Sequence, residues 1–209
     1  VDALTNYITA VGYPDTDSDV FRKFWPADLH MIGKDILRFH AVYWPAFLMS
    51  AGIAPPQRVF AHGWILNKGE KMSKSLGNVL RPHDLVNEFG LDAVRYCLLR
   101  EVPFGQDGYI GRETIISRIN GDLANDLGNL AQRVLSFIAK NAGAKVPQPG
   151  KFTPEDEALL GAAQGLLATL RTELDRQAFH RALEAAWLVI GDANRYVDKQ
   201  APWALRKTD

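Results

Sequence analysis

The sequence contains a single cysteine, Cys97, among its 209 residues. One thiol excludes an internal disulfide and any zinc site built on several cysteines within this chain. Cys97 stands in an apolar stretch, so we expect a buried core side chain rather than a nucleophile. A chain without disulfides suits a reducing compartment, and we therefore expect a cytoplasmic location.

The sequence also has no excess of charge of either sign, because 24 lysines and arginines balance 24 aspartates and glutamates. A strongly basic chain would indicate nucleic-acid binding, whereas a neutral one neither supports nor excludes it, since a local basic patch can hold a large RNA. No apolar run approaches the ~20 residues that cross a bilayer, so we expect no membrane partner. No methionine opens the chain, and we interpret it as a piece of a longer polypeptide.

The first half of the sequence has the pattern of an α/β domain. Residues 27–32 and 58–66 are predicted strands, and 34–50 between them have the period of a helix, which together make a parallel βαβ unit. The predicted helix carries one apolar and aromatic face, formed by Ile36, His40, Tyr43 and Phe47. The polar, glycine-bounded residues 67–78 then predict a loop.

Helical patterns dominate the second half. We expect short helices at 82–89 and 91–100, a glycine-containing connector at 103–111, and long helices at 112–142, 154–174 and 177–199. Thr153, followed by a proline and two acidic residues, predicts the start of the second long helix. The predicted fold class is therefore an incomplete α/β domain over residues 1–111, followed by an all-α bundle over residues 112–209.

The strongest local signal is the pentapeptide KMSKS at residues 71–75. Lys71 and Lys74 are three positions apart in a loop, so both ammonium groups can meet one polyanion, and Ser73 adds a hydroxyl donor. Such a loop can stabilise the charge that develops on the β- and γ-phosphates of ATP as pyrophosphate leaves. Taken by its composition alone, a loop of this kind is more often a solvated basic loop.

The pentapeptide is similar to the second signature motif of class I aminoacyl-tRNA synthetases, and other segments narrow the resemblance to the methionyl-tRNA synthetases. They are VDALTNYI at the start, HMIGKDILRFH at 30–40, AHGW at 61–64, DAVRY at 92–96, DLANDLGNL at 122–130 and QAPW at 200–203. The resemblance implies the second half of a Rossmann-type catalytic domain at 1–111 and an anticodon-binding helical bundle at 112–209. The family's HIGH-type nucleotide motif, and the zinc knuckle of many members, are absent from this chain.

The resemblance implies a methionine pocket formed by Leu4, Tyr7, Ile36 and His40, and it places Asp35 on the methionine amino group or on ATP. A carboxylate suits an ammonium group, and soft aromatic walls suit a thioether. The alternatives are ordinary packing for Leu4 and Tyr7, and a hydrogen-bonded core histidine for His40.

ATP binding is implied for His62, Gly63, Lys71, Ser73 and Lys74, and the two lysines are also the implied catalytic residues. A glycine permits close approach of a planar adenine, although a structural turn is the alternative for Gly63.

Anticodon binding is implied for Asn129, Arg133 and Trp203. Asn129 and Arg133 are four positions apart, so they share a helix face. The resemblance implies that these two side chains hydrogen-bond anticodon bases and that Trp203 stacks on one, which is how single-stranded RNA loops are recognised. A surface arginine and a tryptophan at the end of the bundle are the alternative.

The implied reaction is ATP-dependent ligation of methionine to its tRNA through methionyl-adenylate, with Mg²⁺ accompanying ATP. The expected partners are initiator and elongator methionine tRNAs and the N-terminal half of the same enzyme, without which we expect this chain to be inactive. We expect a monomer and no zinc site in this chain. Two other hypotheses stay open: another class I synthetase, and a tRNA-binding fragment or paralogue without activity.

Overall fold

A computed structural model describes residues 1–67, 69–72 and 77–206 of the chain. The chain divides into two compact units, Val1–Trp64 with Gly105–Asp107, and Ile65–Phe104 with Gly108–Asp209. We name them unit 1 and unit 2. These units are groups of residues that pack together, so they do not test the domain boundary predicted after residue 111, which stays a prediction.

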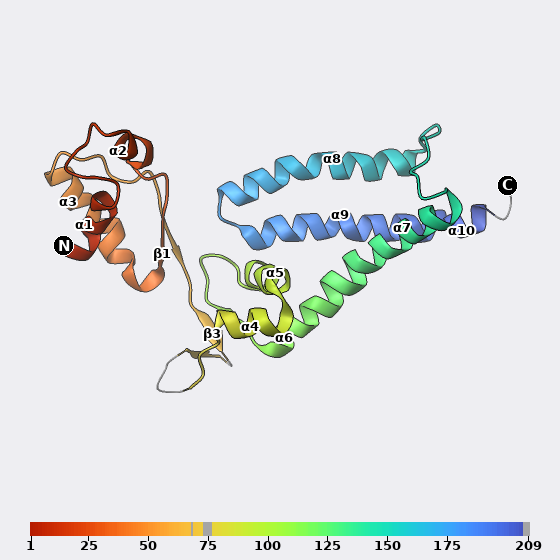
Figure 1. Cartoon of the computed structure of the whole chain (residues 1–209), viewed down its shortest axis with the longest axis horizontal. Helices are drawn as coiled ribbons and strands as arrows, with labels where there is room; N and C mark the ends of the chain where they lie inside the picture. Colours follow the sequence, from red (N-terminus) through yellow and green to blue (C-terminus); the bar gives the residue numbers. More distant parts are fainter. Residues whose placement is uncertain (68, 73–76, 207–209) are drawn as a thin grey trace. The chain divides into compact units, whose positions relative to one another are not determined.

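Unit 1 joins a two-stranded parallel sheet to three α-helices (Figure 1). Strand β1 (His30–Gly33) pairs with β2 (Val59–His62), and Gly33 lies opposite His62 at the carboxyl ends. Helices α1 (Asp2–Thr9) and α2 (Asp19–Phe24) precede the strands. The predicted strand, helix, strand order is confirmed. The core of unit 1 is aromatic and aliphatic, and its buried members are Leu4, Ile8, Phe21, Trp25, Trp44 and Leu48.

The crossover between β1 and β2 is broken into three pieces rather than one regular helix. They are a 3₁₀ turn η1 (Lys34–Ile36), a π-helical turn η2 (Phe39–Tyr43) and α3 (Trp44–Ser50). Pro45 lies in the first turn of α3 and has no N–H to donate to the preceding turn. A π-helical turn accommodates that missing hydrogen bond.

The predicted apolar face of this crossover is buried only in part. His40, Trp44 and Leu48 are buried, whereas Ile36 and Phe47 are each 39% exposed. The buried residues are four positions apart, so the face is rotated by about one residue from the one predicted, because the crossover is not a single regular helix.

The predicted strand over 58–66 is wrong, because it is two strands in two sheets. After β2 the chain stops pairing with β1, and β3 (Ile65–Asn67) pairs with β4 (Glu70–Lys71) and β5 (Gly108–Tyr109). At the break, the Trp64 N–H donates to Asp107 Oδ1 at 2.8 Å instead of to a neighbouring strand.

Unit 2 carries this small sheet and most of the helices (Figure 1). They are α4 (Pro82–Phe89), α5 (Leu91–Glu101), α6 (Arg112–Arg118), the π-helical segment η4 (Ile119–Gly128), α7 (Asn129–Asn141), α8 (Pro154–Asp175), α9 (Phe179–Gln200) and α10 (Pro202–Leu205). Segments α6, η4 and α7 follow one another without a gap, as the predicted first long helix. Helices α8 and α9 lie side by side and run antiparallel.

Two sequence predictions about unit 2 are confirmed. Thr153 Oγ1 accepts a hydrogen bond from the Asp156 N–H at 3.3 Å, and Asp156 Oδ2 accepts one from the Thr153 N–H at 2.7 Å. This capping box starts α8 where the sequence placed it. Cys97 is 1% exposed, and burial raises the pKa of its thiol to about 11, so it is a core side chain. Within the described ranges, no helix has the length and apolar character needed to cross a bilayer.

Candidate functional site

The carboxyl ends of β1 and β2 form one edge of the unit 1 sheet. A Cβ placed on Gly33 would lie 2.7 Å from Asp35 Oδ1 and 3.9 Å from His62 Cε1, so both side chains flank this glycine. His62 Nδ1 donates to the Gly63 carbonyl at 2.8 Å, which fixes the position of the imidazole ring. Ligands of open parallel sheets bind beyond this edge. The structure therefore brings together three predicted ATP residues, Asp35, His62 and Gly63.

Asp107 lies at the same edge and was missed by the sequence analysis. Lys34 Nζ lies 2.7 Å from both carboxylate oxygens, and the Trp64 N–H reaches Oδ1 at 2.8 Å. The hydrogen bond from Lys34, followed by that from the Trp64 backbone, lowers the pKa of the Asp107 carboxyl group. Seventy-three positions separate Lys34 from Asp107, so no local pattern could have joined them.

Tyr7 and His40 are in direct contact inside unit 1. The Tyr7 hydroxyl lies 2.9 Å from His40 Nε2, and His40 Nδ1 lies 3.0 Å from the Ile36 carbonyl oxygen. A carbonyl oxygen only accepts, so Nδ1 carries a proton and, in the neutral ring, Nε2 accepts from the tyrosine hydroxyl. His40 is 5% exposed and both ring nitrogens are paired. This geometry fits a core histidine whose hydrogen bonds are all made. It fits a binding-pocket histidine as well, because the two hydrogen bonds fix the orientation of both side chains.

A cavity of about 290 Å³ opens beside this pair, and it is lined by Tyr7, Trp25 and His30 among others. His30 was not predicted as a site residue. It is 6% exposed, its Nε2 has no hydrogen-bond partner among the described residues, and its ring lies 4.4 Å from that of Tyr7. Burial, and then the nearby His40, lower the pKa of His30, so its neutral form is favoured.

Of the predicted methionine residues only Tyr7 lines this cavity, and His40 contacts it through Tyr7. Leu4 packs in the core of unit 1, and the Ile36 side chain is exposed while its carbonyl holds His40. Asp35 lies at the carboxyl edge of the sheet. The structure thus places Tyr7 and His40 together and separates Asp35 and Leu4 from the cavity wall.

The base of the KMSKS loop is ordered by side-chain contacts in unit 2, while Ser73 and Lys74 lie outside the described residues. Lys71 belongs to β4 and is exposed. Asn67 Nδ2 donates to the Asn78 carbonyl at 2.6 Å, and the Leu80 N–H reaches Met72 Sδ at 3.3 Å. These contacts join the two ends of the loop, so its ends are held close together.

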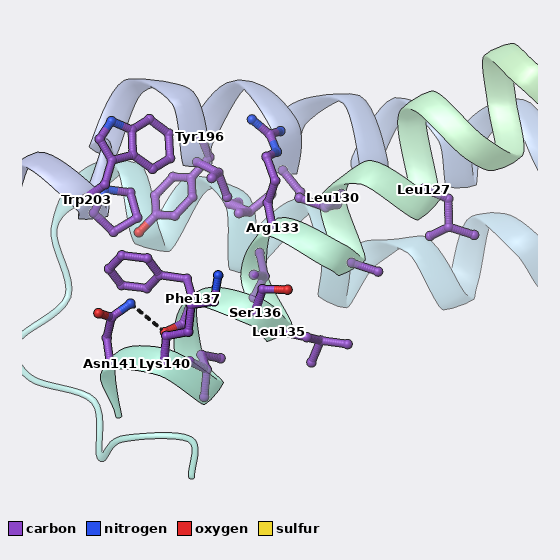
Figure 2. A pocket seen from close by; sticks show the side chains of 17 residues that line it. Leu127, Leu130, Arg133, Leu135, Ser136, Phe137, Lys140, Asn141, Tyr196 and Trp203 are labelled. Carbon is purple, nitrogen blue, oxygen red and sulfur yellow. Dashed lines mark hydrogen bonds between the residues drawn. The ribbon is translucent and has the colours of Figure 1, made fainter. Parts of the chain in front are cut away.

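A larger cavity of about 800 Å³ lies among α7, α9 and α10 of unit 2 (Figure 2). Arg133 and Trp203 both line it, and Trp203 is 46% exposed. The rings of Phe137, Tyr196 and Trp203 gather at one end of the view, with Arg133 farther along α7 (Figure 2). Its wall is mainly apolar, which suits the faces of aromatic rings.

Arg133 is held from α9 by two side chains that the sequence did not indicate. Its Nη1 lies 2.5 Å from Asp198 Oδ1, and its Nη2 donates to Asn194 Oδ1 at 2.5 Å. Asn194 in turn donates to the Asp126 carbonyl at 3.1 Å. Asn129 is exposed at the start of α7, one turn before Arg133, and does not line the cavity. The structure therefore joins two of the three predicted anticodon residues in one cavity.

Among the residues that the structure describes, no three or more His, Cys, Asp or Glu side chains come together in an arrangement that could hold a metal ion.

Comparison with known proteins gives one consistent family. A family model described as tRNA synthetases class I (M) matches residues 1–135. The chain is 64% identical over all 209 residues to the methionine–tRNA ligase of Mycobacterium tuberculosis H37Rv, and 63% identical to that of Brucella suis biovar 1. In both comparisons it spans 40% of the relative's length.

Solved structures agree with these sequence matches. A crystal structure of Mycobacterium tuberculosis methionyl-tRNA synthetase bound by methionyl-adenylate aligns with a TM-score of 0.94 at 64% identity, covering 99% of this chain and 40% of that one. The apo form of the same enzyme aligns with a TM-score of 0.90 at 61% identity, again covering 99% and 40%. The matched family model covers well over half of this chain, which therefore belongs to the class I tRNA synthetases of the M type.

Proposed function

We propose that this chain forms part of a methionine–tRNA ligase, which couples the cleavage of ATP into AMP and pyrophosphate to the attachment of methionine to its tRNA. The observation that carries the proposal is the 64% identity to methionine–tRNA ligases over the entire chain, together with the fit to a structure bound by methionyl-adenylate. On this proposal, residues 1–111 are the second half of a Rossmann-type catalytic domain with its KMSKS loop. Residues 112–209 are the anticodon-binding helical bundle.

Methionine activation is the first proposed step. A carboxylate oxygen of methionine attacks the α-phosphorus of ATP, the bond to the β-phosphate breaks, and pyrophosphate leaves with the electron pair. Tyr7, held by His40, provides an aromatic wall for the thioether side chain. Asp35 supplies a carboxylate for the methionine ammonium group or the ATP ribose. Catalysis on this scheme consists of positioning and charge stabilisation.

The nucleotide contacts come from the sheet edge and from the loop. His62 ends β2 and Gly63 follows it, so the imidazole ring and the Gly63 backbone are the groups proposed to meet the nucleotide beyond this edge. Lys71, Ser73 and Lys74 of the loop then supply cations and a hydroxyl to the leaving pyrophosphate. Mg²⁺ bound together with ATP would supply positive charge to the phosphates, beside the charge that the loop lysines provide.

Transfer to tRNA is the second proposed step. A hydroxyl of the terminal ribose attacks the methionyl carbonyl carbon, and AMP leaves. Arg133 and Asn129 hydrogen-bond anticodon bases along their edges, and Trp203 stacks on one. Two features of unit 2 support this role: Arg133 and Trp203 share one cavity, and Trp203 is half-exposed there. The partners proposed are methionine tRNAs and the N-terminal half of the same enzyme, in a monomeric, cytoplasmic protein.

A second candidate is a tRNA-binding fragment without activity of its own. The arrangement that favours it is the cavity that Arg133 and Trp203 share in unit 2, since its apolar wall suits a stacked base. Another class I synthetase would share the KMSKS loop and differ in the amino acid that it activates.

Methionine-dependent exchange of pyrophosphate into ATP tests these candidates, with the 209-residue chain and the full-length enzyme that contains it measured in parallel. Exchange by the full-length enzyme alone supports the proposal, and exchange that depends on leucine instead of methionine identifies another class I synthetase. No exchange by either protein, with retained binding of a methionine tRNA, supports the tRNA-binding fragment.

A further inference from the structure

We propose that Asp107 is a positioning residue of the nucleotide site, whose carboxylate fixes the ends of β1 and β2 relative to each other. The inference rests on the function proposed above, because it concerns the same sheet edge. Asp107 belongs to the segment Gly105–Asp107, which lies in unit 1 although its flanking residues belong to unit 2.

The carboxylate contacts the neighbours of the predicted ligand residues. Lys34, which pairs with both oxygens at 2.7 Å, directly precedes Asp35. Trp64, whose N–H reaches Oδ1 at 2.8 Å, directly follows Gly63. The Lys34 ammonium also lies 4.4 Å from the centroid of the Trp64 ring, so the cation meets the carboxylate and the indole together. One side chain therefore ties together the two strand ends that carry Asp35 and Gly63.

The backbone beside Asp107 is packed directly on the end of β2. A Cβ on Gly63 would lie 2.1 Å from the Gln106 carbonyl carbon and 2.5 Å from the Asp107 nitrogen. Only glycine leaves room for that contact. On the other side, a Cβ on Gly105 would meet the Phe60 ring at 3.7 Å. The segment is thus in close contact with β2, and the Asp107 carboxylate extends that contact to the end of β1.

The exposure of the ion pair argues for orientation rather than for stability. The side chains of Lys34 and Asp107 are 40% and 35% exposed. Pairs this open to water contribute little to folding. A small displacement of groups that bind a reacting substrate, by contrast, costs a large factor in rate. Loss of the Asp107 charge should therefore raise the KM for ATP while changing the stability of the fold little.

The test uses the full-length enzyme and pyrophosphate exchange, with ATP and methionine titrated separately. Asp107→Asn keeps an oxygen that accepts from the Trp64 N–H but removes the charge that holds Lys34. We expect the KM for ATP to rise about tenfold, the size of one lost charge-assisted contact, while the KM for methionine stays within about twofold. Lys34→Met should give the same pattern, and the double variant should be no worse than either single one, because both changes remove one contact.

Asp28→Asn is the matched control. Asp28 is a carboxylate of the same unit that accepts from Gln57 at 3.1 Å, and it precedes β1, at the opposite edge of the sheet. Thermal unfolding of every variant is recorded alongside the kinetics. If the enzyme is active and Asp107→Asn has the same KM for ATP as Asp28→Asn, the positioning role is overturned. A parallel rise of both KM values with a lowered melting temperature also overturns it, in favour of a structural role. An unsubstituted enzyme that shows no exchange contradicts the proposed function instead.

Discussion

Replacing Tyr7 by phenylalanine probes the contact on which the proposed methionine pocket depends. The change removes one hydroxyl and keeps the ring that packs against His30 and Trp44. His40 Nε2 then loses the donor that now lies 2.9 Å away. The imidazole cannot compensate by moving its proton, because Nδ1 must keep donating to the Ile36 carbonyl.

The expected cost follows from the burial of His40. A net hydrogen bond contributes about 1 kcal/mol, and a buried acceptor left unpaired costs about 1–3 kcal/mol in total. His40 is 5% exposed, so water replaces the hydroxyl poorly and we expect about 2 kcal/mol. That corresponds to a roughly 30-fold larger population of locally opened states.

Hydrogen exchange of the amides in α1 and β1 measures that population directly. Tyr13→Phe serves as the control, since Tyr13 is a tyrosine of the same unit that is 38% exposed. Protection should fall about 30-fold in Tyr7→Phe and stay within about twofold in the control. Equal protection in the two variants would refute the argument that Tyr7 satisfies a buried imidazole.

Four further outcomes are expected. Burial lowers the pKa of His30 from 6.5, so as the pH falls below 6.5 the unfolded state takes up this proton before the folded state does. The free energy of unfolding of unit 1 should therefore fall on acidification. Urea unfolding at about pH 7.5 and 5.5 measures this, and the difference between the two pH values should be smaller in His30→Gln. Tyr96→Phe removes a hydroxyl that donates to a carboxylate at 2.5 Å and should destabilise unit 2 by about 1–2 kcal/mol in thermal unfolding. Gly63→Ala forces a Cβ to within 2.1 Å of backbone and should lower both stability and exchange activity, whereas Gly161→Ala, with open space around it on α8, should be neutral or stabilising. Lys74→Ala should lower the rate of pyrophosphate exchange by roughly 10²-fold with little change in the KM for methionine, and an unchanged rate would exclude a catalytic role for this lysine.

Features encoded within a few neighbouring residues were predictable. The capping box of Thr153 and Asp156 lies within four residues, so the start of α8 follows from local sequence. The order of β1, crossover and β2 follows from apolar periodicity. The KMSKS motif likewise indicated the family, which the comparisons then showed.

The errors arose where a distant residue or a single proline changed the local pattern. The predicted strand over 58–66 breaks after β2, where Asp107, 43 positions after Trp64, accepts the Trp64 N–H. The predicted helix over 34–50 contains a π-helical turn before Pro45, which rotates the buried face. Periodicity assumes that an element continues regularly, and it gives no warning of either interruption.

The sequence by itself determined the family, the helices and strands that local signals encode, and the residue types available for chemistry. Tertiary structure alone decided which of these residues meet. Tyr7 reaches His40 across 33 positions, Arg133 reaches Asp198 across 65, and Lys34 reaches Asp107 across 73. The physical reason is that each contact depends on the packing of whole elements, which fixes side chains to within a hydrogen-bond length, whereas a sequence pattern fixes only the face of the element on which a side chain lies.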